Sequence, residues 1–216
     1  MNHRVKGIAP VAFRDEFAFL HYPVVIFGRH KIEQFVFWKG KCVRDIVLTN
    51  QELKDICTWY QHYGFFFSKI HETLQSSYDF NGRQDVALRL WAALIDIDAA
   101  AALCEIGYAM VNSYYMCVQS IEKSMKSFLM WKGCSDDELR RLGHNLTKTL
   151  DHCRGIDIRY DGYELPLERI QWDQNWRYNP VNVSHDDIIR SFDLALQLCA
   201  QTCECIKVQD GKFVKN

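Results

Sequence analysis

Along most of this chain apolar residues recur every three to four positions, the spacing of one face of an α-helix. The pattern predicts helices over about 50–74, 84–110, 114–132 and 135–153, and a last helix that begins near 184. The 84–110 segment is apolar on more than one side, which is typical of the central helix of a bundle. No proline falls between Pro23 and Pro166, so the long middle of the chain is open to helices.

Residues typical of helix ends support these boundaries. Small polar side chains accept hydrogen bonds from the first turn of a helix, and glycine adopts the left-handed conformation that ends one. A short aromatic helix is also predicted over 167–179, before Pro180. The residues expected to cap or break helices are Asn50, Asn112, Ser113, Gly133, Ser135 with Glu138, and Ser184 with Asp187.

Residues 1–49 differ from the rest of the chain. The stretch from His21 to Thr49 is rich in Val, Ile and Phe and is punctuated by Gly28 and Gly40, which predicts one or two short strands. The expected fold class is therefore all-α, an up-and-down bundle of four to five helices over residues 81–216. Residues 1–80 are expected to form an N-terminal extension with the strands and one helix.

Composition narrows the functional classes. The 216 residues carry a formal net charge of -1, so the strongly basic balance of many nucleic-acid-binding proteins is absent. The start of the chain lacks a secretory signal, and charged residues interrupt the most apolar stretch, so no membrane span is expected. Nine cysteines without regular spacing then indicate reduced thiols and a cytoplasmic protein.

Arg140 and His144 are the first candidate site. On a continuous helix His144 would lie opposite the leucine stripe, and Arg140, one turn earlier, would share its side. Histidine can transfer a proton near neutral pH, and arginine can hold phosphate oxygens with its forked donors. Arg141 is the neighbouring candidate for the same role. The alternative is an ordinary solvated polar face.

Three other groups of residues could have either a functional or a structural role. Arg177 and Tyr178 could stack on bases or hold a phosphate, or they could close the bundle. The acidic residues of the apolar 84–110 helix could form a functional cluster, or they could face a loop or pair with Arg83 or Arg89. Cys199, Cys203 and Cys205 are not accompanied by the paired C-x-x-C motifs or nearby histidines of a zinc site. No metal and no cofactor are therefore expected. The acidic residues in question are Asp96, Asp98 and Glu105.

The order of several short features resembles the HEPN family. Glu122-Lys123 with Lys126 matches the Glu-Lys helix of that family, and a glycine-bounded break follows it. His144-Asn145-Leu146 stands where the family has His-Asp-Leu. Arg177-Tyr178-Asn179-Pro180 resembles its Arg-Tyr-Pro element, with one residue inserted. The resemblance covers about residues 99–216.

This resemblance implies a helical bundle that commonly forms a homodimer, often in toxin–antitoxin or phage-defence systems. It implies a module that binds RNA, nucleotide or a cognate partner such as an antitoxin or a nucleotidyltransferase. The ligand-binding residues carried over from it are Lys123, Lys126, Asn145, Lys148, Arg177 and Tyr178.

Some relatives are metal-independent endoribonucleases with a histidine after an arginine and four to six intervening residues. That spacing is missing from the matching region, since three residues separate Arg140 from His144. Arg14 and His21 have the right spacing but lie far outside it. The preferred hypothesis is therefore noncatalytic binding. An endoribonuclease that uses His144 with Arg140 or Arg141 is the first alternative, and a purely structural dimerisation or interaction protein is the second.

Overall fold

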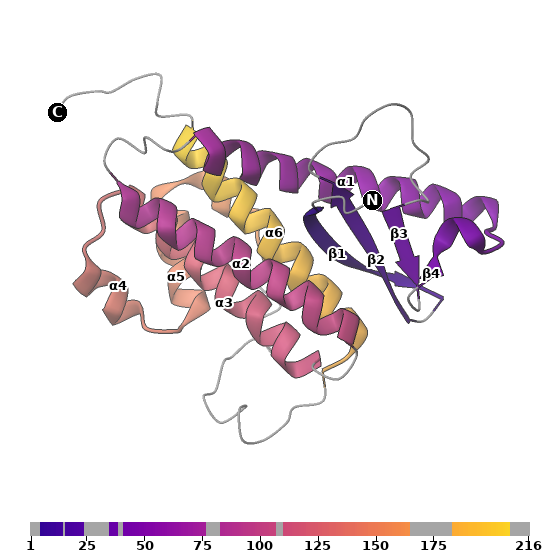
Figure 1. The fold of residues 1–216 in the computed structure, drawn as a ribbon. Helices are drawn as coiled ribbons and strands as arrows, with labels where there is room; N and C mark the ends of the chain where they lie inside the picture. The colour runs from indigo at the N-terminus through magenta and orange to yellow at the C-terminus, as the bar shows by residue number, and fades with distance from the viewer. Residues whose placement is uncertain are drawn as a thin grey trace.

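A computed structural model describes residues 5–14, 16–23, 35–38, 41–76, 83–106, 110–164 and 183–207. The described chain is mostly helical, with a small antiparallel sheet formed by the N-terminal residues (Figure 1). The sheet lies at one end of the helical bundle, and helix α4 lies at the other. This arrangement confirms a helical bundle preceded by N-terminal strands.

The sheet has four strands in the order β1-β2-β3-β4, each antiparallel to its neighbour. Strands β1 (Val5–Phe13) and β2 (Glu16–Pro23) form a long hairpin, and β3 (Val36–Trp38) and β4 (Lys41–Cys42) are short. The one or two short strands predicted between His21 and Thr49 are present as β3 and β4, but the longer β1–β2 hairpin, most of which lies before His21, was not predicted. Its pattern was obscured by Gly7 and by Pro10, which an edge strand such as β1 tolerates.

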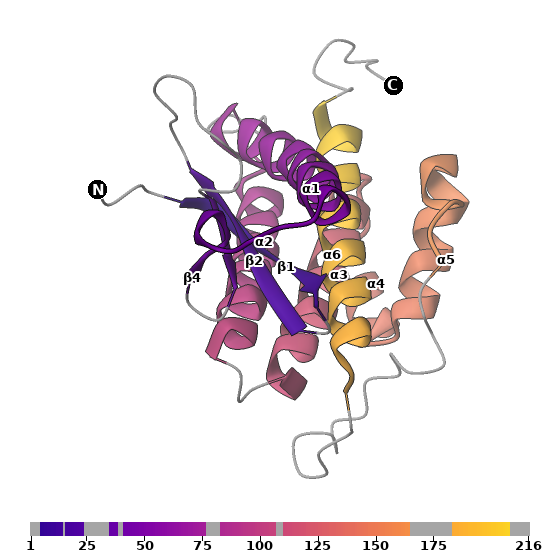
Figure 2. The same cartoon turned by 90° about the vertical axis from the view of Figure 1, so that its right-hand side faces the viewer.

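Six α-helices follow in the described residues, with two single 3₁₀ turns, η2 (Val43–Asp45) and η4 (Ile158–Tyr160). Helix α3 packs against both α2 and α6, α1 lies against α6 (Figure 2), and β1 contacts α2 and α6. The inner helix is therefore α3, and the expectation that the 84–110 helix is central was wrong. The helices are α1 (Asn50–Ser76), α2 (Gln84–Ile106), α3 (Met110–Trp131), α4 (Asp136–Leu142), α5 (Leu146–Ile156) and α6 (His185–Lys207).

Two predicted helix ends need correction. Helix α1 is capped by Thr49, whose Oγ1 accepts from Glu52 N at 3.2 Å while Thr49 N donates to the Glu52 carboxylate at 2.7 Å. Asn50 is the first helical residue. The predicted break at Asn112 and Ser113 lies inside α3, because the Ser113 hydroxyl donates to the Ala100 carbonyl of α2 at 2.8 Å instead of capping α3.

The helix predicted over 135–153 is two helices. Gly143 ends α4 with a φ of +59°, a conformation that favours glycine. The Asn145 side chain then caps α5, where it accepts from Lys148 N at 3.0 Å. The helical spacing of the leucines runs across this break, because both short helices turn an apolar face to the core. Leu139, Leu146 and Leu150 are all buried.

The other caps are confirmed. Gly133 has a φ of +94°, and Ser135 forms the predicted capping box with Glu138. Ser184 and Asp187 make the equivalent bonds at the start of α6. The short helix predicted over 167–179 and Pro180 lie outside the described residues.

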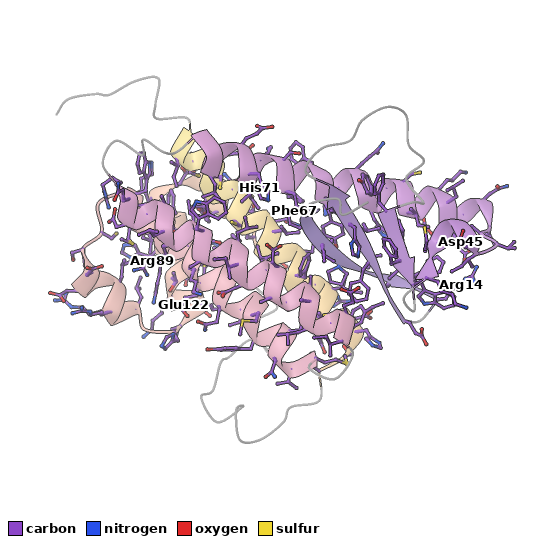
Figure 3. All side chains as sticks on the ribbon, in the orientation of Figure 1. Arg14, Asp45, Phe67, His71, Arg89 and Glu122 are labelled. Carbon is purple, nitrogen blue, oxygen red and sulfur yellow. The ribbon has the colours of Figure 1, made fainter. Side chains whose placement is uncertain are left out.

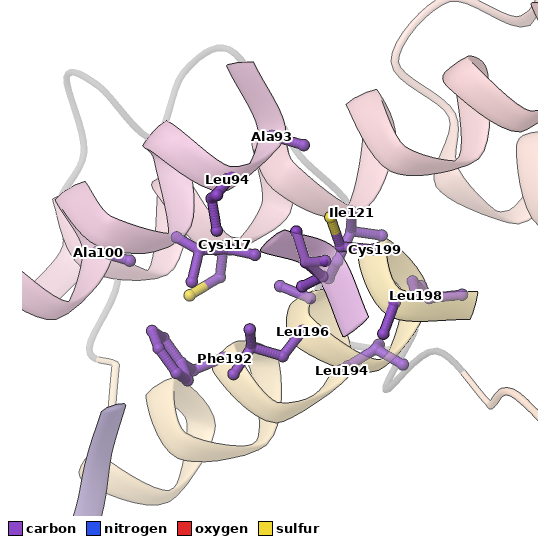
Figure 4. Close-up of a cluster of buried hydrophobic side chains, with 14 of the residues drawn as sticks. Ala93, Leu94, Ala100, Cys117, Ile121, Phe192, Leu194, Leu196, Leu198 and Cys199 are labelled. Carbon is purple, nitrogen blue, oxygen red and sulfur yellow. The ribbon is translucent and has the colours of Figure 1, made fainter. Parts of the chain in front are cut away.

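The hydrophobic core runs from the sheet into the bundle. Figure 4 shows its centre, where Leu94 of α2, Cys117 and Ile121 of α3 and Phe192 of α6 meet. No helix in the described parts of the chain is both long and apolar enough to span a membrane. The predicted stripe of α6 is buried throughout: Ile188, Phe192, Ala195, Cys199, Thr202 and Ile206.

Candidate functional site

A buried carboxylate on α3 organises the junction between α4 and α5. Glu122, which is labelled in Figure 3, is 7% exposed, and the two oxygens of its side chain have different partners. Oε1 accepts from Lys126 Nζ at 2.7 Å, and Oε2 lies 3.0 Å from His144 Nδ1. Glu122 and Lys126 are one turn apart, so they occupy the same face of α3.

Lys126 contributes a second tie to the same junction. Its ammonium donates to the carbonyl oxygen of Gly143 at 2.6 Å, one residue before His144. Only 10% of its side chain is exposed, and the same is true of Glu122. Buried charges are tolerated when each is paired and hydrogen bonded, and this pair meets that condition. Helix α3 therefore holds the α4–α5 junction through both a backbone carbonyl and an imidazole.

His144 is held at the surface by one ring nitrogen. A carboxylate can only accept, so Nδ1 carries the proton in its contact with Glu122. The imidazole is otherwise open, with 58% of the side chain exposed. Nε2 is thus the ring nitrogen that does not contact Glu122. The arrangement fixes the tautomer of a histidine on the exposed junction just before the first turn of α5.

A second ion pair links α3 to α2 beside this site. Lys123 Nζ lies 2.5 Å from Asp96 Oδ2, and 32% of the Lys123 side chain is exposed. Burial raises the pKa of Asp96, while the bond to Lys123 opposes that rise. The prediction that Asp96 pairs with Arg83 or Arg89 was wrong. Arg83 instead bonds Asp85 and the Met130 carbonyl.

The structure separates the predicted arginines from His144. Arg140 and Arg141 lie on α4, which ends at Leu142, so the expected row along one helix face does not exist. Arg140 is 80% exposed and lies 3.5 Å from the carboxylate of Asp137. Its guanidinium is therefore a surface group.

The remaining predicted ligand residues have mixed placements. The Asn145 side chain is used as the cap of α5, and the Lys126 ammonium already has two protein partners. Lys148 is exposed on the first turn of α5. Arg177 and Tyr178 lie outside the described residues.

The nuclease-like pair in the N-terminal hairpin is not a site. Arg14 stands at the hairpin turn and donates to Glu52 at 2.6 Å. His21 lies along β2 opposite Ile8. An extended strand separates two residues seven positions apart by roughly 20 Å, so these side chains cannot act together.

The fold also creates a cysteine–histidine contact that no sequence pattern predicts. Cys134 Sγ lies 3.7 Å from His152 Nε2, between the end of α3 and helix α5. Burial and the nearby Glu138 raise the pKa of the Cys134 thiol, which disfavours a thiolate nucleophile. Among the residues that the structure describes, no three His, Cys, Asp or Glu side chains converge as metal ligands.

Sequence reasoning missed the Glu122–His144 contact, although a signal for it exists. Glu122 and Lys126 are charged residues adjacent to the apolar positions Ile121 and Met125, where solvated side chains are unexpected. Such a pair indicates a buried ion pair, and a buried ion pair needs further hydrogen-bonding partners from elsewhere in the chain.

Fold and site together define a helical bundle with a small antiparallel sheet and a histidine anchored by a buried ion pair. Comparisons of the chain with protein-family models, with curated proteins and with solved structures found no match.

Proposed function

We propose that this chain is a HEPN-like module that binds phosphate groups of RNA or a nucleotide at the α4–α5 junction without cleaving them. The observation that carries the proposal is the fixed, exposed imidazole of His144 immediately before the first turn of α5. A helix N-terminus offers free backbone N–H groups and a positive dipole end to an anion. Because Nδ1–H is donated to Glu122, Nε2 becomes a donor to the phosphate when the imidazole is protonated, and the ring then also carries a positive charge.

Nearby cations support this assignment. Lys148 is exposed one turn after His144, and Lys123 is partly exposed on α3, one turn before Lys126. Contacts of this kind bind phosphate without reading a base sequence. The low net charge of the whole chain argues for a small ligand or a short contact with RNA, and against a long electrostatic groove.

Within the described part of the chain no hydrogen bond or ion pair joins His144 to an arginine, which favours binding over cleavage. A metal-independent ribonuclease needs an acid or base and a cation that stabilises charge on the reacting phosphate. His144 is the candidate for the acid or base. Arg140 lies on α4, where it is exposed and paired with Asp137.

The test uses a labelled single-stranded RNA pool and the purified full chain in EDTA, run on native and denaturing gels. The wild type is expected to shift RNA without shortening it, and His144→Ala is expected to weaken the shift. His152→Ala is the matched control, because His152 is also an exposed histidine but lies on α5, beyond the junction that holds His144. A parallel salt titration should show the affinity falling steeply if phosphates dominate. RNA that stays unshifted, with labelled ATP also unbound, would reject the proposal.

An endoribonuclease is the second candidate, and the Glu122–His144 bond favours it. A carboxylate that orients a histidine through Nδ1 is the arrangement of many acid–base catalysts. In this case the wild type would shorten the RNA in EDTA, and His144→Ala would stop cleavage while the helical circular-dichroism signal persists. The same gels therefore separate the two candidates.

A further inference from the structure

Helix α2 carries an uncovered apolar stripe. Leu88, Ile95 and Ile106 are 69%, 61% and 63% exposed, and Trp91 is 39% exposed. Their spacing of three, four and eleven residues, with the exposed Ala102 between the last two, keeps them on one side of the helix. Helix α2 passes in front of α6 in Figure 1, at the surface of the bundle.

The stripe is distinct from the face that α2 buries. Leu90, Leu94 and Ile97 belong to the core and are almost fully covered. A helix that is apolar on two sides is expected to be covered on two sides, yet the described residues cover only one. The four exposed side chains present roughly 400 Å² of apolar surface, a size at which patches often mark interaction sites.

Charges beside the stripe indicate the chemistry of the partner. Asp98 and Glu105 are both exposed along one flank of the stripe. Partial desolvation raises the pKa of Asp98 to about 6, so the group is mostly ionised at neutral pH. Helix α2 has four acidic residues and a single cation, Arg89. The C-terminal end of its dipole adds negative potential near Glu105.

A second copy of this chain fits the stripe poorly. Two antiparallel α2 helices related by a two-fold axis would bring identical flanks together, so Asp98 and Glu105 would face the acidic flank of the other copy. Arg89 cannot relieve the repulsion. It lies on the opposite flank and about 14 Å along the axis from Asp98. In a parallel pair the acidic flank would instead face the flank of the other copy that carries Asp96. Lys123 is already paired with Asp96.

We propose that the outer face of α2 binds an amphipathic helix of a partner protein whose apolar side is flanked by lysine or arginine. The stripe from Leu88 to Ile106 extends over about 27 Å, the length of an 18-residue helix. The apolar face supplies the affinity, and the acidic flank selects the partner and its orientation.

The experiment measures fluorescence anisotropy of two labelled 18-residue helical peptides titrated with the full chain. The peptides share a leucine face and differ only in flanking lysines or glutamates. The lysine peptide is expected to bind at least about tenfold more tightly. The double variant Leu88→Gln/Ile95→Gln should weaken that binding about tenfold or more. Asp98→Asn/Glu105→Gln should abolish the preference between the peptides.

Ile158→Gln is the control, because Ile158 is 79% exposed but lies on η4, away from α2. It should leave peptide binding unchanged. All replaced side chains are exposed, and circular dichroism verifies the fold of each variant. Equal binding of both peptides, no binding, or binding that survives Leu88→Gln/Ile95→Gln overturns the proposal. A dimer seen by light scattering and dissociated by the same double variant would make a second copy the occupant and also overturn it.

Discussion

Removal of the Glu122 charge tests the central feature of the site. Glu122→Gln preserves the size of the side chain and its ability to accept a hydrogen bond. It leaves the Lys126 ammonium, whose side chain is 10% exposed, with only neutral hydrogen-bond acceptors and no opposite charge. It also removes the ionised acceptor of His144 Nδ1.

The magnitude follows from burial. Breaking a buried ion pair by removing one partner costs about 3–5 kcal/mol, because the other charge stays desolvated and unpaired. Lys126 is almost fully buried, but in Glu122→Gln its ammonium keeps neutral hydrogen-bond acceptors, so the low end of this energy range applies. We therefore expect Glu122→Gln to lower the free energy of unfolding by about 3 kcal/mol.

Urea unfolding at pH 7, followed by circular dichroism, measures this loss. A double-mutant cycle isolates the pair from other effects of substitution. Glu122→Met and Lys126→Met should each destabilise the chain by about 2–4 kcal/mol, while the double variant should cost less than their sum by about 2 kcal/mol or more. Asp151→Asn is the control, since it removes an exposed pair with Arg154 and should change stability by less than about 0.5 kcal/mol.

Two results would refute this reasoning. One is a cost below about 1 kcal/mol for Glu122→Gln, which is the range of surface pairs. The other is additivity of the two methionine variants within about 0.5 kcal/mol, which would mean that the side chains do not interact. Either result would also remove the physical basis for a fixed His144.

Three further predictions concern the backbone conformation of Gly143, the ion pair of Asp157 and the packing at Gly7. Gly143→Ala should cost about 1–3 kcal/mol in urea unfolding, because its φ of +59° is strained for alanine although nothing lies within 4 Å of the added methyl. Bonds from Arg159 hold the pKa of Asp157 at about 2, so Asp157→Asn should be less stable than the wild type by about 1 kcal/mol at pH 7. A depressed pKa stabilises the fold above the ordinary pKa, so the difference should disappear as the pH falls from about 4 to 2; a constant difference would contradict the assignment. Gly7→Ala should destabilise by about 1–3 kcal/mol, because its methyl would overlap the buried ring of Phe67, and Phe67→Leu should recover part of that loss if the overlap is the cause.

Local signals in the sequence were sufficient for much of the helical framework. The apolar spacing of α6 and its Ser184 cap depend on neighbours within a few residues, and so does the Ser135–Glu138 capping box. These features are visible without the fold because helix periodicity and caps are short-range properties. They placed His144 on the polar side of one helix predicted over 135–153, whereas it lies at the junction between α4 and α5.

The position at which one helix ends and the next begins could not be predicted from the spacing of apolar residues alone. The leucine spacing across Gly143 predicted one helix, since two short helices that face the same core preserve nearly the same pattern. The β1–β2 hairpin was missed because Gly7 and Pro10 weaken its strand pattern. Its strands form through pairing with each other and packing on the helices, and these contacts depend on the tertiary structure.

The sequence by itself therefore determined which segments are helical, how α3 ends, how α4 and α6 begin, and which faces are apolar. Only the tertiary structure decided that His144 contacts Glu122, 22 residues away, and not Arg140, four residues away. It also decided that one apolar side of α2 is exposed. The physical reason is that the packing of the helices decides which side chains meet across the bundle. The spacing of apolar residues along one helix shows only that this face of the helix packs against another element.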